Sequence, residues 1–341
     1  MSFLKRMNIK KLASWAGSLL MVVSLVFIGR RIFLTSDEVD WSVFTNPVIL
    51  TALISIALLE GVGILMTALN YRAMVANVSG IKVKYALALV VYSVSNLYKF
   101  IPGGVMYVLG RNKMAIDTDG LSHAKVGIAT FLEGATIAIA AITVAFTFSF
   151  RHTVYYLQQI EFAAWLLILI ATVLVILVCV AVYFRQKLHK LWLKLKEDTK
   201  DLRPLVMLRR LLIAFILIIL FAFTFLATLM LLGQEVTFRL GITIMGLYML
   251  SWVAGFLTPG APSGLGVREA VMLMFMGDTI NATVLVSAMV MHRLLTVTGD
   301  VSAYGIALVF ARIAKMREKN TPQEAEPIAT YEATQTEENE A

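Results

Sequence analysis

The sequence has 341 residues, of which 59% are hydrophobic and only 15% are charged, and its formal net charge is +8. Several apolar runs exceed the roughly 18 residues that are typical of a membrane-spanning helix. This composition excludes a soluble globular domain. Because backbone groups in a bilayer must be hydrogen-bonded within their own segments, we expect an all-α polytopic membrane protein.

Eight hydrophobic segments follow one another along the chain. They lie near residues 12–34, 47–69, 85–101, 122–150, 162–184, 211–233, 241–257 and 281–311. The first follows a basic start and is not followed by a small-residue cleavage pattern, so we interpret it as an uncleaved helix with a cytoplasmic amino terminus. The last is long enough to be tilted, or broken at Gly299.

Charged loops set the expected orientation. Residues 36–40 (SDEVD) are acidic and are placed outside, whereas residues 185–210 carry nine Lys or Arg and are placed in the cytoplasm. Residues 320–341 hold six acids and no base, which predicts a disordered acidic tail. We therefore expect a membrane domain over 1–319, with halves of about 1–184 and 211–319 joined by the basic loop. Both termini are then cytoplasmic.

Two Pro-Gly stretches interrupt apolar segments. With the orientation set by the charged loops, residues 85–110 begin and finish on the same side of the membrane. This predicts a re-entrant helix hairpin that turns at Pro102–Gly104. Segment 241–257, the turn TPGAPSG (258–264) and residues 265–277 predict a second hairpin of opposite orientation. The expected fold has about six full transmembrane helices plus two re-entrant hairpins in an inverted repeat. Eight plain crossings are the alternative.

The hairpins supply the candidate substrate-binding residues, because interrupted segments in opposite halves indicate a transport site at the bilayer midplane. Helix amino termini bind phosphate, and an Arg adds a planar donor fork. The candidates are Asn96, Lys99, Pro102, Gly103, Gly104 and Arg111 from the first hairpin, and Gly264, Gly266, Arg268 and Glu269 from the second. Two alternatives stay open: Glu269 pairs with Arg268, and Arg111 snorkels to the interface.

Four more ionisable residues lie within apolar segments: Glu60, Glu133, Arg293 and Asp300. Buried carboxylates are costly unless they are paired or protonated. Glu60 and Glu133 are therefore predicted either to couple proton movement to transport or to pair with Arg268 or Arg293 and lock helices together. Arg293 and Asp300 are seven residues apart and share one helical face.

Other chemistry lacks support in the sequence. The four histidines have no zinc spacing, and there is no phosphate-binding P-loop motif. The methionines of residues 271–277 are interpreted as packing residues. We expect no cofactor, no metal, no nucleic-acid partner and no enzymatic activity.

Residues 259–270 (PGAPSGLGVREA) resemble the P-G-G-L-G-V-x-E signature of the lysylphosphatidylglycerol synthase transmembrane region, a flippase-like family. Ser263 replaces a glycine of that signature. The family's N-x(5)-P-G-G pattern is similar to Asn96 with Pro102, Gly103 and Gly104, followed by Arg111. Glu133 and Arg293 match further positions, although Gly134 stands where an arginine often follows. The resemblance implies a lipid-translocating domain without the family's soluble synthase domain.

Three hypotheses for the function follow. The leading one is movement of a phosphate-bearing phospholipid or polyprenyl-phosphate-linked sugar between leaflets of a bacterial inner membrane, whose anionic lipid the basic loops contact. The second is a non-transporting partner of a lipid or cell-envelope biosynthesis enzyme. The third is an intramembrane serine hydrolase built on APSG (261–264), with His292 as base. We interpret His292 instead as a packing histidine.

Overall fold

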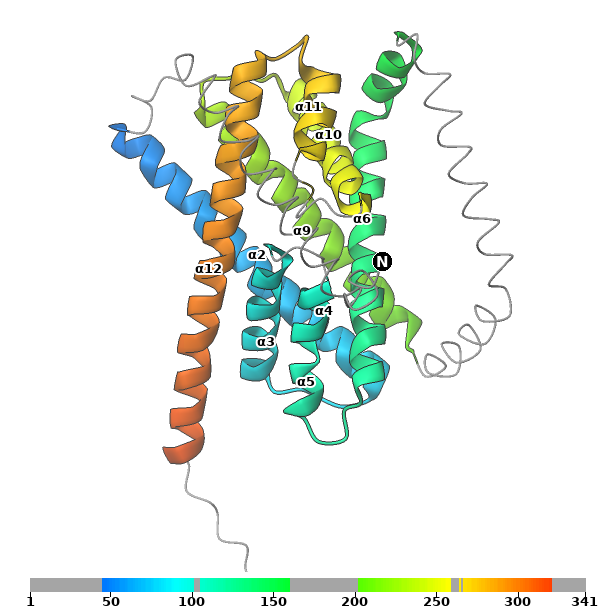
Figure 1. The fold of residues 1–341 in the computed structure, drawn as a ribbon, viewed down its shortest axis with the longest axis vertical. Helices are drawn as coiled ribbons and strands as arrows, with labels where there is room; N and C mark the ends of the chain where they lie inside the picture. Colours follow the sequence, from blue (N-terminus) through cyan, green and yellow to red (C-terminus); the bar gives the residue numbers. More distant parts are fainter. Residues whose placement is uncertain (1–44, 101–104, 160–201, 259–263, 265, 321–341) are drawn as a thin grey trace, which may run out of the picture.

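The computed structural model describes residues 45–100, 105–159, 202–258, 264 and 266–320, and every element within them is helical (Figure 1). The elements are α2 (Pro47–Ser79), α3 (Tyr85–Leu97), η4 (Tyr98–Phe100), α4 (Val105–Arg111), α5 (Lys113–Ile116), α6 (His123–Gln159), α9 (Pro204–Leu231), α10 (Phe238–Leu257), α11 (Val267–Met276) and α12 (Ala282–Asn320). The predicted helices at 12–34 and 162–184, most of the basic loop 185–210 and the acidic tail lie outside the described residues.

Five of these helices are long and apolar enough to cross a membrane: α2, α6, α9, α10 and α12. This confirms the expectation of an all-helical, multi-pass membrane protein. On α2, the exposed side chains Leu50, Ile54, Leu58, Val62 and Met66 recur every four residues and form one stripe. An exposed apolar stripe of this length is the surface that lipid tails cover.

Local signals explain where the helices begin and end. The Asn46 side chain accepts a hydrogen bond from the Val48 amide at 2.9 Å, and Pro47 occupies the first turn of α2. The same helix ends at Gly80, whose φ of 75° lies in the left-handed region. Pro204 likewise occupies the first turn of α9. α2 ends ten residues after the predicted apolar segment 47–69, so the helix continues beyond the apolar run.

The long helices frame two helix pairs. In Figure 1, α12 and α6 stand upright on opposite sides, and α2 and α9 cross between them obliquely. α3 and α4 pack together in the lower half of the view, and α10 and α11 pack together in the upper half. These pairs occupy the segments for which the sequence predicts the two hairpins. Their turns, residues 101–104 and 259–263, lie outside the described residues.

The lengths of the arms differ. α3 has 13 residues, which gives a rise of about 20 Å and falls short of the roughly 30 Å hydrocarbon core. α10 has 20 residues and is long enough to cross alone. The second apolar arm is therefore longer than the first, a difference the sequence segments 85–101 and 241–257 did not indicate.

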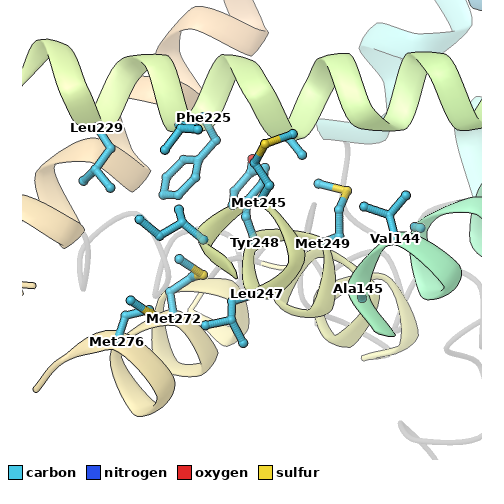
Figure 2. Close-up of a cluster of buried hydrophobic side chains, with 14 of the residues drawn as sticks. Val144, Ala145, Phe225, Leu229, Met245, Leu247, Tyr248, Met249, Met272 and Met276 are labelled. Atoms are coloured by element: carbon cyan, nitrogen blue, oxygen red, sulfur yellow. The ribbon is translucent and has the colours of Figure 1, made fainter. Parts of the chain in front are cut away.

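One apolar core lies beside the second pair. Val144 and Ala145 of α6, Phe225 and Leu229 of α9, Met245, Leu247, Tyr248 and Met249 of α10, and Met272 and Met276 of α11 pack together there (Figure 2). Met272 and Met276 are fully buried. The methionines at these two positions are therefore packing residues, as the sequence predicts.

α2 and α12 approach closely at two glycines. A Cβ atom at Gly299 would lie 2.6 Å from the Cβ of Glu60 and 3.0 Å from the carbonyl oxygen of Ala57. A Cβ atom at Gly61 would lie 3.1 Å from the carbonyl oxygen of Gly299. Small residues allow such backbone contact between membrane helices. α12 runs unbroken through Gly299, so the predicted break is absent and the glycine serves the helix contact.

We expect Gly299→Ala to destabilise the protein, because the new methyl group meets the backbone of α2, which cannot move aside. The expected loss is about 1–3 kcal/mol in the free energy of unfolding, the usual effect of overpacking. Gly305→Ala on the same helix is the matched control, since nothing lies within 4 Å of its added Cβ. Thermal unfolding in detergent measures both, and equal melting temperatures would contradict the close contact.

Candidate functional site

A cavity of about 670 Å³ lies at the centre of the helices, where both helix pairs meet α2, α6, α9 and α12. Most of the predicted site residues line it. They are Glu60, Asn96, Lys99, Arg111, Glu133, Gly264, Arg268, Glu269, Arg293 and Asp300. Gly266 is not among the lining residues, and Pro102, Gly103 and Gly104 lie outside the described part of the chain.

The lining carries four Lys or Arg residues and four Asp or Glu residues, and its walls are otherwise largely apolar. Charges within the membrane are costly unless they are paired and hydrogen-bonded. The way these eight charges pair therefore decides which of them are available to a ligand.

The first pair is Arg111 with Glu133, which joins α4 to α6. The two side chains are only 3% exposed. The Tyr92 hydroxyl donates to the other Glu133 oxygen at 2.6 Å, and the Arg111 guanidinium lies over the Tyr71 and Tyr92 rings at 4.5 Å. Arg111 is therefore buried in an aromatic cage, and the snorkelling alternative is wrong. The partner of Glu133 is therefore Arg111, and not Arg268 or Arg293, which were considered from the sequence.

The second pair is Lys99 with Asp300, at 2.7 Å between Nζ and Oδ2. The Asn96 amide donates to the other Asp300 oxygen, also at 2.7 Å. Asp300 lies on α12, whereas Asn96 and Lys99 lie at the end of the first helix pair. These contacts tie α3 and η4 to α12 and orient both predicted binding residues toward the cavity wall.

The third pair is Arg293 with Glu269, at 3.3 Å. The second Glu269 oxygen accepts the amide hydrogen of Gly266 at 2.8 Å and so caps the first turn of α11. Gly264 and Gly266 have φ values of 70° and 82°, which glycine adopts readily. Glu269 therefore contacts Arg293 and a helix amino terminus, and the suggested Arg268–Glu269 pair is not formed.

Arg268 differs from the other three cations. Among the described residues, no Asp or Glu lies within ion-pair distance of it, and its Nε atom is buried without a hydrogen-bond partner. Its guanidinium lies against the Tyr248 hydroxyl and 5.8 Å from the centre of the Trp252 ring. Gly255 and Gly264 make room for it, since a Cβ on Gly255 would lie 3.0 Å from the Cγ of Arg268.

Glu60 also differs from the other acids. The Thr224 hydroxyl donates to its Oε1 at 2.5 Å, and His292 Nε2 lies 3.5 Å from the same oxygen. His292 is 1% exposed, and its Nδ1 lies 2.9 Å from the Tyr248 hydroxyl. Neither Arg268 nor Arg293, the partners considered from the sequence, pairs with Glu60.

Sequence reasoning missed the roles of Thr224, Tyr248 and His292 in this network. A histidine within an apolar span is itself a signal of function, but Thr and Tyr are common in such spans. The serine-hydrolase hypothesis gains no support from the network: both ring nitrogens of His292 are engaged by Tyr248 and Thr224, and Ser263 lies outside the described residues.

No protein-family model matches the chain, and no curated protein matches it. The family resemblance of residues 259–270 therefore stays a hypothesis. The geometry of the cavity is the basis on which a function is proposed.

We expect Glu133→Gln to destabilise the protein by about 3–5 kcal/mol, because it leaves the buried Arg111 charge without its carboxylate. Adding Arg111→Gln should recover part of this loss, since both charges are then gone. Asp117→Asn is the control, because it breaks the partly exposed Lys113–Asp117 pair, which contributes little. Thermal unfolding of the native protein, the two single variants, the double variant and Asp117→Asn checks this, and strictly additive losses would contradict a coupled pair.

Proposed function

We propose that the chain moves the head group of a phosphate-bearing lipid, or of a lipid-linked sugar, between the two leaflets through the central cavity. The observation that carries the proposal is Arg268. It lines a cavity in which the other three cations are each paired with a carboxylate, and within the described residues it has none. A buried guanidinium of this kind is a ready site for a phosphate, which its planar donors contact in pairs.

The cavity supports this choice of substrate. Its volume of about 670 Å³ falls in the range of sites for small molecules. Apolar side chains such as Ile64, Leu217 and Phe256 also line the cavity. A polar head group has partners in such a cavity, while the acyl or prenyl chains stay in the surrounding lipid.

The two helix pairs supply a path for the movement. In the proposal, α3 with α4 and α10 with α11 are re-entrant hairpins of opposite orientation. The short α3 supports this for the first pair, because about 20 Å of helix does not cross the bilayer. Rocking of one half against the other would then expose Arg268 to each leaflet in turn.

Three further assignments belong to the same proposal. The chain is placed in a bacterial inner membrane with both termini in the cytoplasm, from the basic loop 185–210. It is assigned to the lysylphosphatidylglycerol synthase transmembrane region, from the resemblance of residues 259–270. Its substrate is a phospholipid or a polyprenyl-phosphate-linked sugar, because both present phosphate to Arg268.

Lipid movement in liposomes tests the function. Purified protein is reconstituted with lipids labelled on the head group, one lipid class at a time, and an impermeant quencher reports the labelled lipid that reaches the outer leaflet. We expect movement for at least one phosphate-bearing class and a loss of at least about tenfold in Arg268→Ala, the usual value of a charge-assisted contact. Arg268→Lys should fall between the two, because it keeps the charge and loses the fork.

Arg239→Ala is the matched control, because Arg239 is exposed at the start of α10 and does not line the cavity. It should leave the rate unchanged. A folded protein that moves none of the lipid classes would contradict the proposal and favour a non-transporting partner of a lipid or cell-envelope enzyme. An equal loss in Arg239→Ala would show that the effect of Arg268 is not specific to the cavity.

A further inference from the structure

We propose that Glu60, Thr224, His292 and Tyr248 form a proton-binding site, so that the protein binds H⁺ as a second ligand beside the one held at Arg268. The four side chains come from four helices, α2, α9, α12 and α10, and converge at one wall of the cavity. Glu60 itself lines the cavity, so a proton reaches it from there.

The choice of partner separates Glu60 from the other acids of the cavity. Glu133, Glu269 and Asp300 each pair with an Arg or a Lys, which stay charged at physiological pH. In the described part of the chain, the basic group beside Glu60 is His292 alone. Histidine is the side chain whose charge changes near neutral pH, so this acid has no permanent positive charge to hold it ionised.

The hydrogen bonds satisfy the ionised state of Glu60. When the imidazole hydrogen is on Nε2, the Tyr248 hydroxyl donates to Nδ1 of His292 at 2.9 Å, and Nε2–H donates to the Thr224 hydroxyl at 3.0 Å. The Thr224 hydroxyl then donates to the Glu60 carboxylate at 2.5 Å. In this arrangement the imidazole is neutral, and each hydrogen bond from Tyr248 through His292 and Thr224 is donated in the direction of the Glu60 carboxylate.

The same atoms also satisfy the protonated state. A hydronium ion in the cavity transfers a proton to Glu60 and leaves as water, and the new hydroxyl of Glu60 donates to Thr224. The Thr224 hydrogen turns to the carbonyl oxygen of Phe221, which is 2.7 Å away. The threonine oxygen has two lone pairs, so it still accepts from His292. No heavy atom moves, no other bond breaks, and the charge of the site rises by one.

The charged and titratable groups near Glu60 are known for each helical element around the cavity. α9 lines the cavity with Thr224 and apolar side chains, and contributes no ionisable group to the lining. The others that face the cavity are Tyr92 of α3, Lys99 of η4, Tyr107 and Arg111 of α4, Glu133 of α6, Tyr248 of α10, Arg268 and Glu269 of α11, and Arg293 and Asp300 of α12. Three ion pairs among them leave Arg268 as the cation without a carboxylate.

Tyr248 connects the proton site to Arg268, because its hydroxyl contacts both the guanidinium and the His292 ring. A phosphate bound at Arg268 neutralises a positive charge beside this network, which favours proton binding. By linkage the proton favours phosphate binding by the same factor. This coupling rests on the proposed function, whereas the proton site itself does not.

Infrared spectroscopy of the full chain in lipid tests the proton site without any substrate. When the pH is lowered stepwise over the acidic range, we expect a carboxylic-acid carbonyl band that is present in the native protein and missing in Glu60→Gln. His292→Gln should change the frequency of this band, because it alters the hydrogen bonds around Glu60. Glu235→Gln, an exposed acid outside the cavity, should retain the band. A native spectrum identical to that of Glu60→Gln over this range would overturn the proposal.

Lipid movement under a pH gradient tests the coupling. We expect a gradient to change the native rate on the order of tenfold, in the range of typical coupling energies, and the rates with and without the gradient to become equal in Glu60→Gln. Equal native rates would overturn the coupling. An absence of movement in every sample would contradict the proposed function, while the infrared band would still decide the proton site.

Discussion

The low dielectric of the membrane interior requires each buried charge to have a partner, and the helical arrangement depends on this constraint. Each pair joins two different helical elements, so that moving these two elements apart would separate a charge from its partner. The pairs are Arg111 of α4 with Glu133 of α6, Lys99 of η4 with Asp300 of α12, and Glu269 of α11 with Arg293 of α12. Apolar packing supplies the bulk of the contact area, and these pairs determine which faces of the helices meet.

The same constraint makes the other two charges of the cavity lining, Arg268 and Glu60, informative about function. Arg268 is surrounded by Tyr248, Trp252 and two glycines, none of which neutralises it. Glu60 is held by hydroxyl groups and a histidine. Among the described residues, these two groups lack the pairing of Lys or Arg with a carboxylate that the other six have, and the proposed ligand sites rest on this difference.

The apolar runs predicted α2, α6, α9 and α12, because the thickness of the bilayer sets the length of a spanning helix. The sequence did not allow us to predict which charged residues pair. Glu133 and Arg111 are 22 residues apart, whereas Glu60 and Thr224 are 164 apart. Which pair forms depends on the rotation and depth of each helix, which apolar packing and the charge pairs set together. Hydrophobic periodicity does not encode them, so the predicted partners Arg268 and Arg293 were wrong for both glutamates.

The four positive and four negative charges of the cavity lining sum to zero. Moving one elementary charge through a potential of about 100 mV changes the free energy by about 2.3 kcal/mol, so in the proposed transport the empty cavity would alternate between the two faces without sensitivity to voltage. A phosphodiester with one negative charge would make it sensitive, and a proton taken up with it would cancel that charge. The charge balance of the empty cavity thus makes one monoanion with one proton an electroneutral load.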